Sequence, residues 1–226
     1  MIRNVDIDEI SDGRRYRSQD MVKIGCAECA GCSECCRLTD DTIILDPYDI
    51  FELCRGLDTT FDLLLSGVYG ACGGPLIPIS SPVIELGLAD GLMLPHLRVD
   101  AAGEGCIFLN KEGRCMIHGF RPGFCRLYPL GRIYEDGSFS YFLQVNECPY
   151  PNKTKVKIKK WLGIDNLSEY ETFVLKWHDT LEESRKEASG ISDQSELSRY
   201  LVSFLKRYYQ TPYDTDGSFY EQFRER

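Results

Sequence analysis

The chain has 226 residues, a formal net charge of −9 and a hydrophobic fraction of 43%. This length fits one domain with an appendage, and the apolar fraction excludes global disorder. No stretch approaches the ~20 apolar residues of a membrane helix, the first residues hold no apolar segment of a signal peptide, and an acidic chain has no general affinity for nucleic acid. We therefore expect a cytoplasmic protein that binds neither membrane nor nucleic acid.

Cysteine and charge are distributed unevenly along the chain. All 11 cysteines lie between Cys26 and Cys148. Residues 1–152 carry 13 basic and 22 acidic side chains, whereas residues 153–226 carry 13 of each. Because a reducing cytosol does not keep disulfides, so many thiols indicate metal binding. We predict a cysteine-cluster metal-binding domain at 1–152 and a helical C-terminal extension at 153–226 that packs on it.

The first elements are predicted from their caps. Asp46 followed by Pro47 is typical of a helix start, which predicts a helix to about Arg55. Thr59 and Asp62 resemble a capping box for a second short helix over FDLLLS. Residues 71–100 are rich in Gly and Pro and favour short strands and turns.

Two hairpins and a helical tail follow. One hairpin is expected over residues 106–117, with Cys106 and Cys115 as diagonal neighbours about 7–8 Å apart on one face. Another is expected over 132–144 around an Asp-Gly turn. The apolar spacing of the tail predicts helices at 154–162, about 169–188 and 195–209. The fold class is therefore α+β, an irregular cysteine-rich core of short helices and hairpins followed by a helical part.

The chemistry is concentrated in the segment GCAECAGCSECCR. The spacing Cys26-x2-Cys29-x2-Cys32-x3-Cys36 matches the bacterial ferredoxin run that binds iron–sulfur clusters, except that Arg37 replaces the usual proline. From Cys29, the same residues form a CxxCxxCC box. Four further cysteines follow downstream, and Cys148 precedes a proline as in ferredoxins. The candidate metal ligands are Cys26, Cys29, Cys32, Cys35, Cys36, Cys106, Cys115, Cys125 and Cys148.

The box, the segment ILDPYDI, the segment CIFLNKEGRCMIHGFRPGFCRLYPLGR and the late cysteine together resemble the YkgJ-type cysteine-cluster family, also called the zinc- or iron-chelating CxxCxxCC domain. The resemblance covers roughly residues 22–150. It implies a metal or iron–sulfur centre in a cytosolic prokaryotic protein. One branch, the flagellin lysine methylases, is similar in cysteine pattern and implies cluster- and S-adenosylmethionine-dependent methylation. Cys26 is additional to the family's usual eight cysteines.

The sequence allows one metal site or two, and either an iron–sulfur cluster or zinc as the metal. Cys35 and Cys36 are adjacent, so in an extended stretch their side chains point to opposite faces. Either two metal sites share the eight motif cysteines, or one cluster binds four of them and the other four are spare. The ferredoxin-like spacing favours a [4Fe–4S] centre, and zinc is the alternative because four thiolates also suit a structural zinc site. We expect Cys29, Cys32, Cys36 and Cys125 to include ligands.

Several other side chains are expected to have roles other than metal ligation. Arg121 and Arg126 flank Cys125 and are predicted to contact a negatively charged cluster, with ion pairing to acidic residues as the alternative. His118 is expected to form structural hydrogen bonds rather than to bind metal. Cys54 and Cys72 are expected in the core. The lysine run at 153–160 reads as a solvated helix start, or as a surface for an anionic partner.

Three functions therefore remain open, because the chain has no GxGxxG, Walker, HExxH or GxSxG motif. The protein could handle electrons or sense redox state through an iron–sulfur centre, in which case a redox partner is expected. It could be a cluster-dependent modifying enzyme, as the resemblance to the methylases implies. It could instead be a zinc-stabilised interaction module without catalytic activity, whose tail binds a protein partner.

Overall fold

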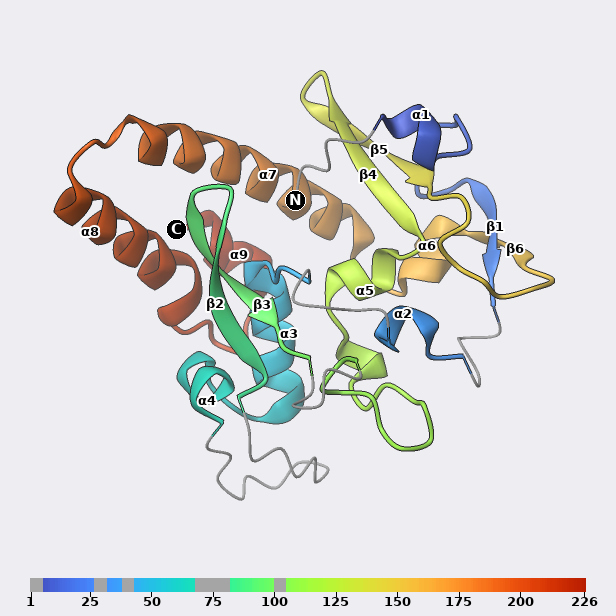
Figure 1. Cartoon of the computed structure of the whole chain (residues 1–226), viewed down its shortest axis with the longest axis horizontal. Coiled ribbons are helices and arrows are strands. Elements are labelled where there is room, and N and C mark those ends of the chain that lie inside the picture. The colour runs from blue at the N-terminus through green and yellow to red at the C-terminus, as the bar shows by residue number, and fades with distance from the viewer. Residues whose placement is uncertain (1–5, 27–31, 38–42, 68–81, 100–104) are drawn as a thin grey trace.

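The computed structural model describes residues 6–26, 32–37, 43–67, 82–99 and 105–226 (Figure 1). Cys29 and Cys72 therefore lie outside the described residues. Short helices and two-stranded antiparallel sheets alternate through the first part of the chain, and helices dominate the last part. The α+β prediction with a helical C-terminal part is confirmed.

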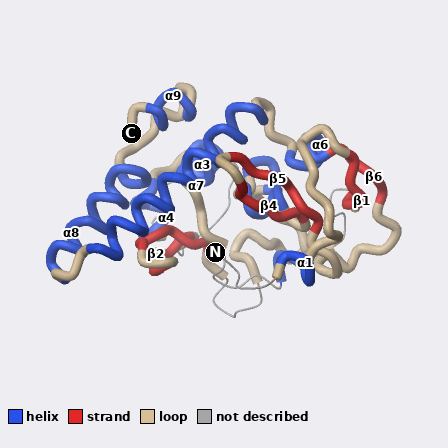
Figure 2. The backbone as a smooth tube through the Cα atoms, turned by 90° about the horizontal axis from the view of Figure 1, so that it is seen from above, coloured by secondary structure: helices blue, strands red, loops and turns tan. Residues whose placement is uncertain are grey.

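The strands of the described residues form three separate antiparallel pairs, which Figure 2 shows as short red stretches of the tube. The pairs are β1 (Met21–Gly25) with β6 (Thr154–Lys157), β2 (Ile84–Ala89) with β3 (Leu92–Leu97), and β4 (Leu130–Glu135) with β5 (Ser138–Leu143). The β4–β5 hairpin turns at Asp136 and Gly137, which both have positive φ, as the Asp-Gly signal predicts.

Short helices surround these pairs in the cysteine-rich part. They are α1 (Ile7–Ile10), α2 (Glu34–Arg37), α3 (Pro47–Leu57), α4 (Phe61–Ser66), the 3-10 turn η2 (His118–Phe120) and α5 (Gly123–Leu127). Helix α3 begins as expected: the Asp46 carboxylate accepts from the Asp49 N–H, and Asp49 accepts from the Asp46 N–H. The cap of α4 is Thr60 rather than Thr59.

The tail contains α6 (Ile158–Leu162), α7 (Leu167–Gly190), α8 (Gln194–Leu205), the π-helical turn η3 (Lys206–Gln210) and α9 (Phe219–Arg224). In Figure 1, α7 and α8 diverge from their connection, and the β2–β3 hairpin lies against them. None of the helices in the described ranges is long and apolar enough to cross a membrane.

Two sequence predictions are wrong. The segment 154–162 does not form one helix, because Lys155, Val156, Lys157 and Ile158 alternate with the period of a strand, and Val156 pairs with the buried Val22 of β1. Residues 106–117 form turns with an isolated bridge between Leu109 and Cys115 instead of a regular hairpin. Cys106 is bridged to Val99, so the expected diagonal placement of Cys106 and Cys115 does not hold.

The main hydrophobic core is shared by the two parts of the chain. Ile50 and Leu53 of α3 belong to the same buried cluster as Phe173 and Trp177 of α7 and Phe219 of α9. The Tyr209 hydroxyl donates to the Leu45 carbonyl at 3.0 Å across this core. A smaller cluster lies under β1, β4 and α6. The tail therefore completes the core on which the cysteine-bearing segments rest.

Candidate metal centre

Five cysteines from three distant segments line one cavity of about 170 Å³. Helix α2 supplies Cys35 and Cys36, the turns after β3 supply Cys106 and Cys115, and α5 supplies Cys125. The two adjacent cysteines lie in a helix rather than in an extended stretch, so both of them reach the same cavity. The extended stretch in which their side chains would point to opposite faces is therefore not formed.

A second group of cysteines gathers around Cys148. Burial raises the pKa of the Cys148 thiol, and the neighbouring thiols of Cys26 and Cys32 raise it further. Tyr128 lies between the two groups, because it lines the cavity and its hydroxyl donates to the carbonyl of Glu147, the residue before Cys148. Burial raises the pKa of this hydroxyl, and the thiols of Cys148, Cys35 and Cys32 raise it further. All the described cysteines except Cys54 thus fall into a cavity group and a Cys148 group, the latter formed by Cys26, Cys32 and Cys148.

A glycine allows α2 to meet the segment that carries Cys106. The Cys106 N–H donates to the Cys36 carbonyl at 2.8 Å. Gly105 has a φ of +138°, and a Cβ at this position would lie 2.6 Å from the Cys36 carbonyl oxygen. A larger residue would therefore separate the two segments of the cavity.

The helix that carries Cys125 is held from two sides. The Gly123 N–H donates to the buried Asp49 carboxylate at 2.7 Å, which ties α5 to the capping box of α3. On the other side, a Cβ on Gly123 would lie 2.2 Å from the Tyr170 hydroxyl oxygen of α7. Burial raises the pKa of Asp49 to about 6. Asp49 is a positioning residue that the sequence analysis missed, although its place three residues after Asp46 marks it as a capping-box partner.

The surroundings of four of the cavity thiols favour the protonated form. Burial raises the pKa of Cys106 to about 11 and raises those of Cys115 and Cys125 as well, while a hydrogen bond to Cys36 raises that of Cys35.

The nine described cysteines are free of disulfides. Soft sulfur donors suit zinc and iron–sulfur clusters, so the donor set fits the expected metals. In the described parts of the chain, no three His, Cys, Asp or Glu side chains are already close enough to hold an ion. Metal binding would therefore have to displace these protons and draw the thiolates together.

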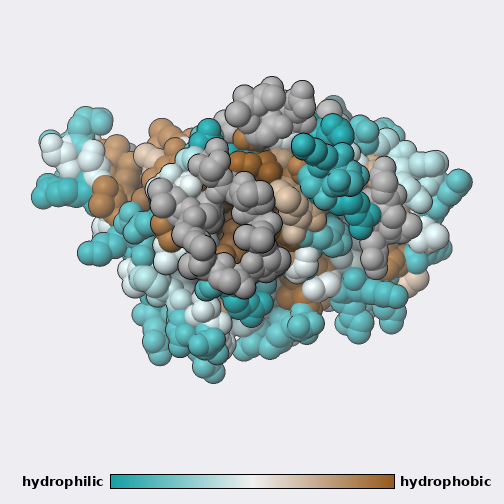
Figure 3. Space-filling model, turned by 90° about the horizontal axis from the view of Figure 1, so that it is seen from below, coloured by the Kyte–Doolittle hydropathy of each residue, from teal (hydrophilic) through white to brown (hydrophobic). Residues whose placement is uncertain are grey.

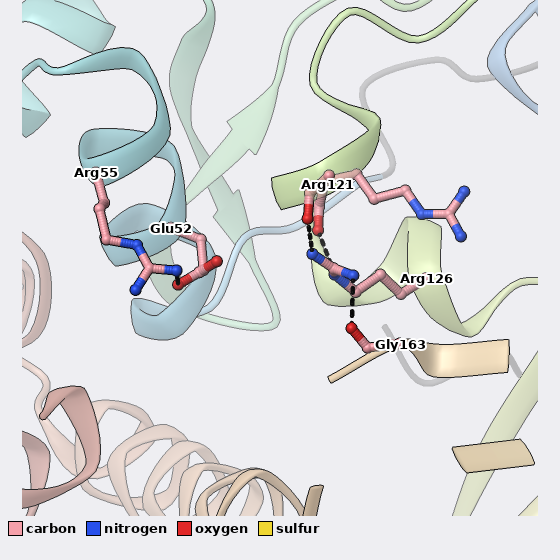
Figure 4. Close-up of polar contacts among 6 residues, drawn as sticks. Glu52, Arg55, Arg121, Arg126 and Gly163 are labelled. Atoms are coloured by element: carbon pink, nitrogen blue, oxygen red, sulfur yellow. Dashed lines mark hydrogen bonds and ion pairs between the residues drawn. The ribbon is translucent and has the colours of Figure 1, made fainter. Parts of the chain in front are cut away.

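The two candidate arginines have different surroundings (Figure 4). Arg126 donates to main-chain carbonyls on both sides of it, those of Gly119 at 2.6 Å, Arg121 at 3.0 Å, Leu162 at 3.4 Å and Gly163 at 3.3 Å. The last two lie at the end of α6, so Arg126 joins α5 to the tail. Arg121 lines the cysteine cavity and bonds the His118 ring at 3.0 Å. Burial raises the pKa of Cys115 and Cys125, and the charge of Arg121 offsets part of this rise.

This difference predicts separable effects of two substitutions. We expect Arg126→Ala to lower the free energy of unfolding by about 2 kcal/mol, because charged donors to several carbonyls are lost, and to leave the metal content unchanged. We expect Arg121→Ala to alter the absorption spectrum and reduction potential of the loaded protein, because a positive charge beside the thiolates is lost. Urea unfolding, metal analysis and a redox titration check these effects. Loss of metal in Arg126→Ala with unchanged stability would contradict the assignment.

Arg132, Arg37 and Cys54 lie outside the cavity lining. Arg132 packs over the rings of Tyr170 and Phe139, at 5.5 and 5.7 Å from their centroids, and Arg37 donates to the Ser33 hydroxyl at 2.9 Å. Cys54 packs against the main core, and burial raises its pKa to about 12. The core role expected for Cys54 agrees with this position.

A family model matches residues 28–149 of the chain, which is more than half of its length. The model is that of the CxxCxxCC family, described as a "putative zinc- or iron-chelating domain". The match confirms the resemblance inferred from the cysteine box and the downstream motif. Comparisons with curated proteins and with solved structures gave no match.

Proposed function

Because the chain belongs to the CxxCxxCC family of zinc- or iron-chelating domains, we propose that it is a cytosolic metal-binding protein whose cysteines hold a [4Fe–4S] centre. The observation that carries the proposal is the convergence of five cysteines from three segments on one cavity. Residues so far apart in sequence line a common space only through the fold. Of the two roles left open for an iron–sulfur centre, we propose the redox role.

We assign the ligands to the cavity group: Cys106, Cys115, Cys125 and one of the pair Cys35 and Cys36. The Cys148 group supports the alternative of a second metal site. Cys26, Cys32 and Cys148 would form this site together with Cys29 of the CxxCxxCC box. Two groups also account for more cysteines than one tetrahedral or cubane site needs.

A bound iron–sulfur cluster supplies one-electron chemistry, and the residues of the chain supply its surroundings. Phe124, Pro122 and Tyr128 line the cavity together with the thiols and limit the access of water. Arg121 offsets part of the negative charge of the thiolates. The Asp49–Gly123 bond keeps Cys125 in place while the other segments adjust.

The proposal is tested by purifying the protein without oxygen and measuring its iron, zinc, acid-labile sulfide and absorption spectrum. We expect iron and sulfide in equal amounts and the brown colour of sulfur-to-iron charge transfer. Zinc without sulfide, in a colourless protein, would replace this proposal with the zinc-stabilised interaction module. A protein that takes up neither metal would contradict metal binding itself.

A further inference from the structure

An exposed group of lysines covers the outer side of the β1–β6 pair and the start of α6. The register places Lys23 opposite Lys155 and Met21 opposite Lys157 on one side, while Val22 and Val156 face the core. We call the following five exposed residues the lysine face: Lys23, Lys155, Lys157, Lys159 and Lys160. The end of the molecule that carries β1 and β6 is largely hydrophilic (Figure 3).

The lysine face concentrates positive charge in an acidic chain. Residues 153–160 include five lysines and no acidic residue, in a chain whose net charge is −9. Among the described residues, the ion pairs are made by arginines, and none includes a lysine of this face. Like charges directly opposite each other destabilise an antiparallel pair, so Lys23 and Lys155 oppose the stability of β1–β6. Folding stability therefore does not explain this arrangement.

The lysine face borders the Cys148 group. Strand β1 ends at Gly25, directly before the buried Cys26. Lys153, just before β6, donates from Nζ to the Cys148 carbonyl at 2.6 Å. Lys23, Lys153 and Cys148 also line a common hollow of about 340 Å³. A molecule bound to the lysine face would therefore lie beside these cysteines.

We propose that the lysine face is a docking surface for an acidic protein, which binds at the end of the molecule that carries Cys26 and Cys148. Complementary charge steers such a partner and sets its orientation. The role of the partner, to exchange electrons with the metal centre, rests on the proposed function, whereas the docking itself does not.

A protein fits this surface better than a nucleic acid or a membrane. Extended polyanions would also meet the remaining acidic surface of a chain with a net charge of −9, which repels them. An acidic patch on a protein can match the small area of two short strands. Met21 is 48% exposed beside Lys157, and methionine is enriched at protein interfaces.

The test measures the binding of a short acidic peptide, fluorescently labelled hexaglutamate, to the full-length protein purified without oxygen, by anisotropy. We expect binding that weakens as salt is added, and a loss of about tenfold or more in affinity in the double variant Lys155→Glu, Lys157→Glu. The matched control is Lys111→Glu, Lys186→Glu, which changes the net charge equally at exposed lysines elsewhere. We expect the affinity of the control to stay within about twofold of the wild type.

Three results would overturn the proposal. They are the absence of hexaglutamate binding, equal weakening in the control variant, and tighter binding of duplex DNA or phosphatidylserine vesicles than of hexaglutamate. Metal content is measured in the same samples. A protein that binds the peptide at the lysine face but takes up no metal would retain the docking surface and disprove the proposed function. A protein that takes up metal but does not bind the peptide would disprove the docking surface alone.

Discussion

Replacing Cys125 by serine should remove metal from the protein and lower its melting temperature together. Cys125 lies on α5, which the Asp49–Gly123 bond fixes in place, and it lines the cavity with cysteines from two other segments. A metal held by all three segments closes long loops in the folded chain, so its binding free energy adds to folding. Iron and sulfide analysis and thermal unfolding of the anaerobically purified variant check this prediction.

Cys54→Ser is the matched control, because Cys54 is also a partly buried cysteine but packs against the main core away from the cavity. This variant should keep its metal and show only the modest loss of stability caused by a polar group in the core. If Cys125→Ser retained full iron, sulfide and melting temperature, the downstream cysteines would not be ligands. The cavity would then be a structural feature of the core.

Elements with strong local signals could be predicted from the sequence. The Asp46-Pro47 start defines α3, the Asp136-Gly137 turn defines β4–β5, and the apolar spacing around Phe173 and Trp177 defines the buried face of α7. In each case the deciding interactions lie within a few residues, since caps, tight turns and helical periodicity act locally. The cysteine box and the downstream motif likewise identify the family from short segments.

Features that depend on distant pairing could not be predicted in this way. β1 and β6 are more than a hundred residues apart, and nothing in TKVK alone specifies that Val156 pairs with Val22. The division of the cysteines into two groups arises from the same kind of contact, such as the bond between the Cys106 N–H and the Cys36 carbonyl. Spacing indicates that thiols can bind metal, but tertiary structure determines which of them share a cavity.

A second large effect, a loss of folding stability, is expected when Phe173 in the shared core is replaced by alanine. Phe173 of α7 is 4% exposed, and its ring lies edge-on to Phe219 at 5.0 Å and to Phe223 at 4.8 Å, both of α9. It also packs against Tyr48 of α3 at 6.2 Å. Removing a buried phenylalanine ring leaves a cavity and costs about 3–5 kcal/mol, a large part of the total stability of a domain.

Urea unfolding of Phe173→Ala should show this loss, with Leu88→Ala of β2 as the control. Leu88 is 68% exposed and lies outside the cavity lining, so its truncation removes little buried area and should cost about 1 kcal/mol or less. Because α3 carries the capping box that holds α5, loosening the contact of α7 with α3 should also lower the melting temperature of the metal-loaded protein. An unchanged unfolding midpoint in Phe173→Ala would mean that the tail does not support the cysteine-rich part, and that the metal centre is held by residues 1–152 alone.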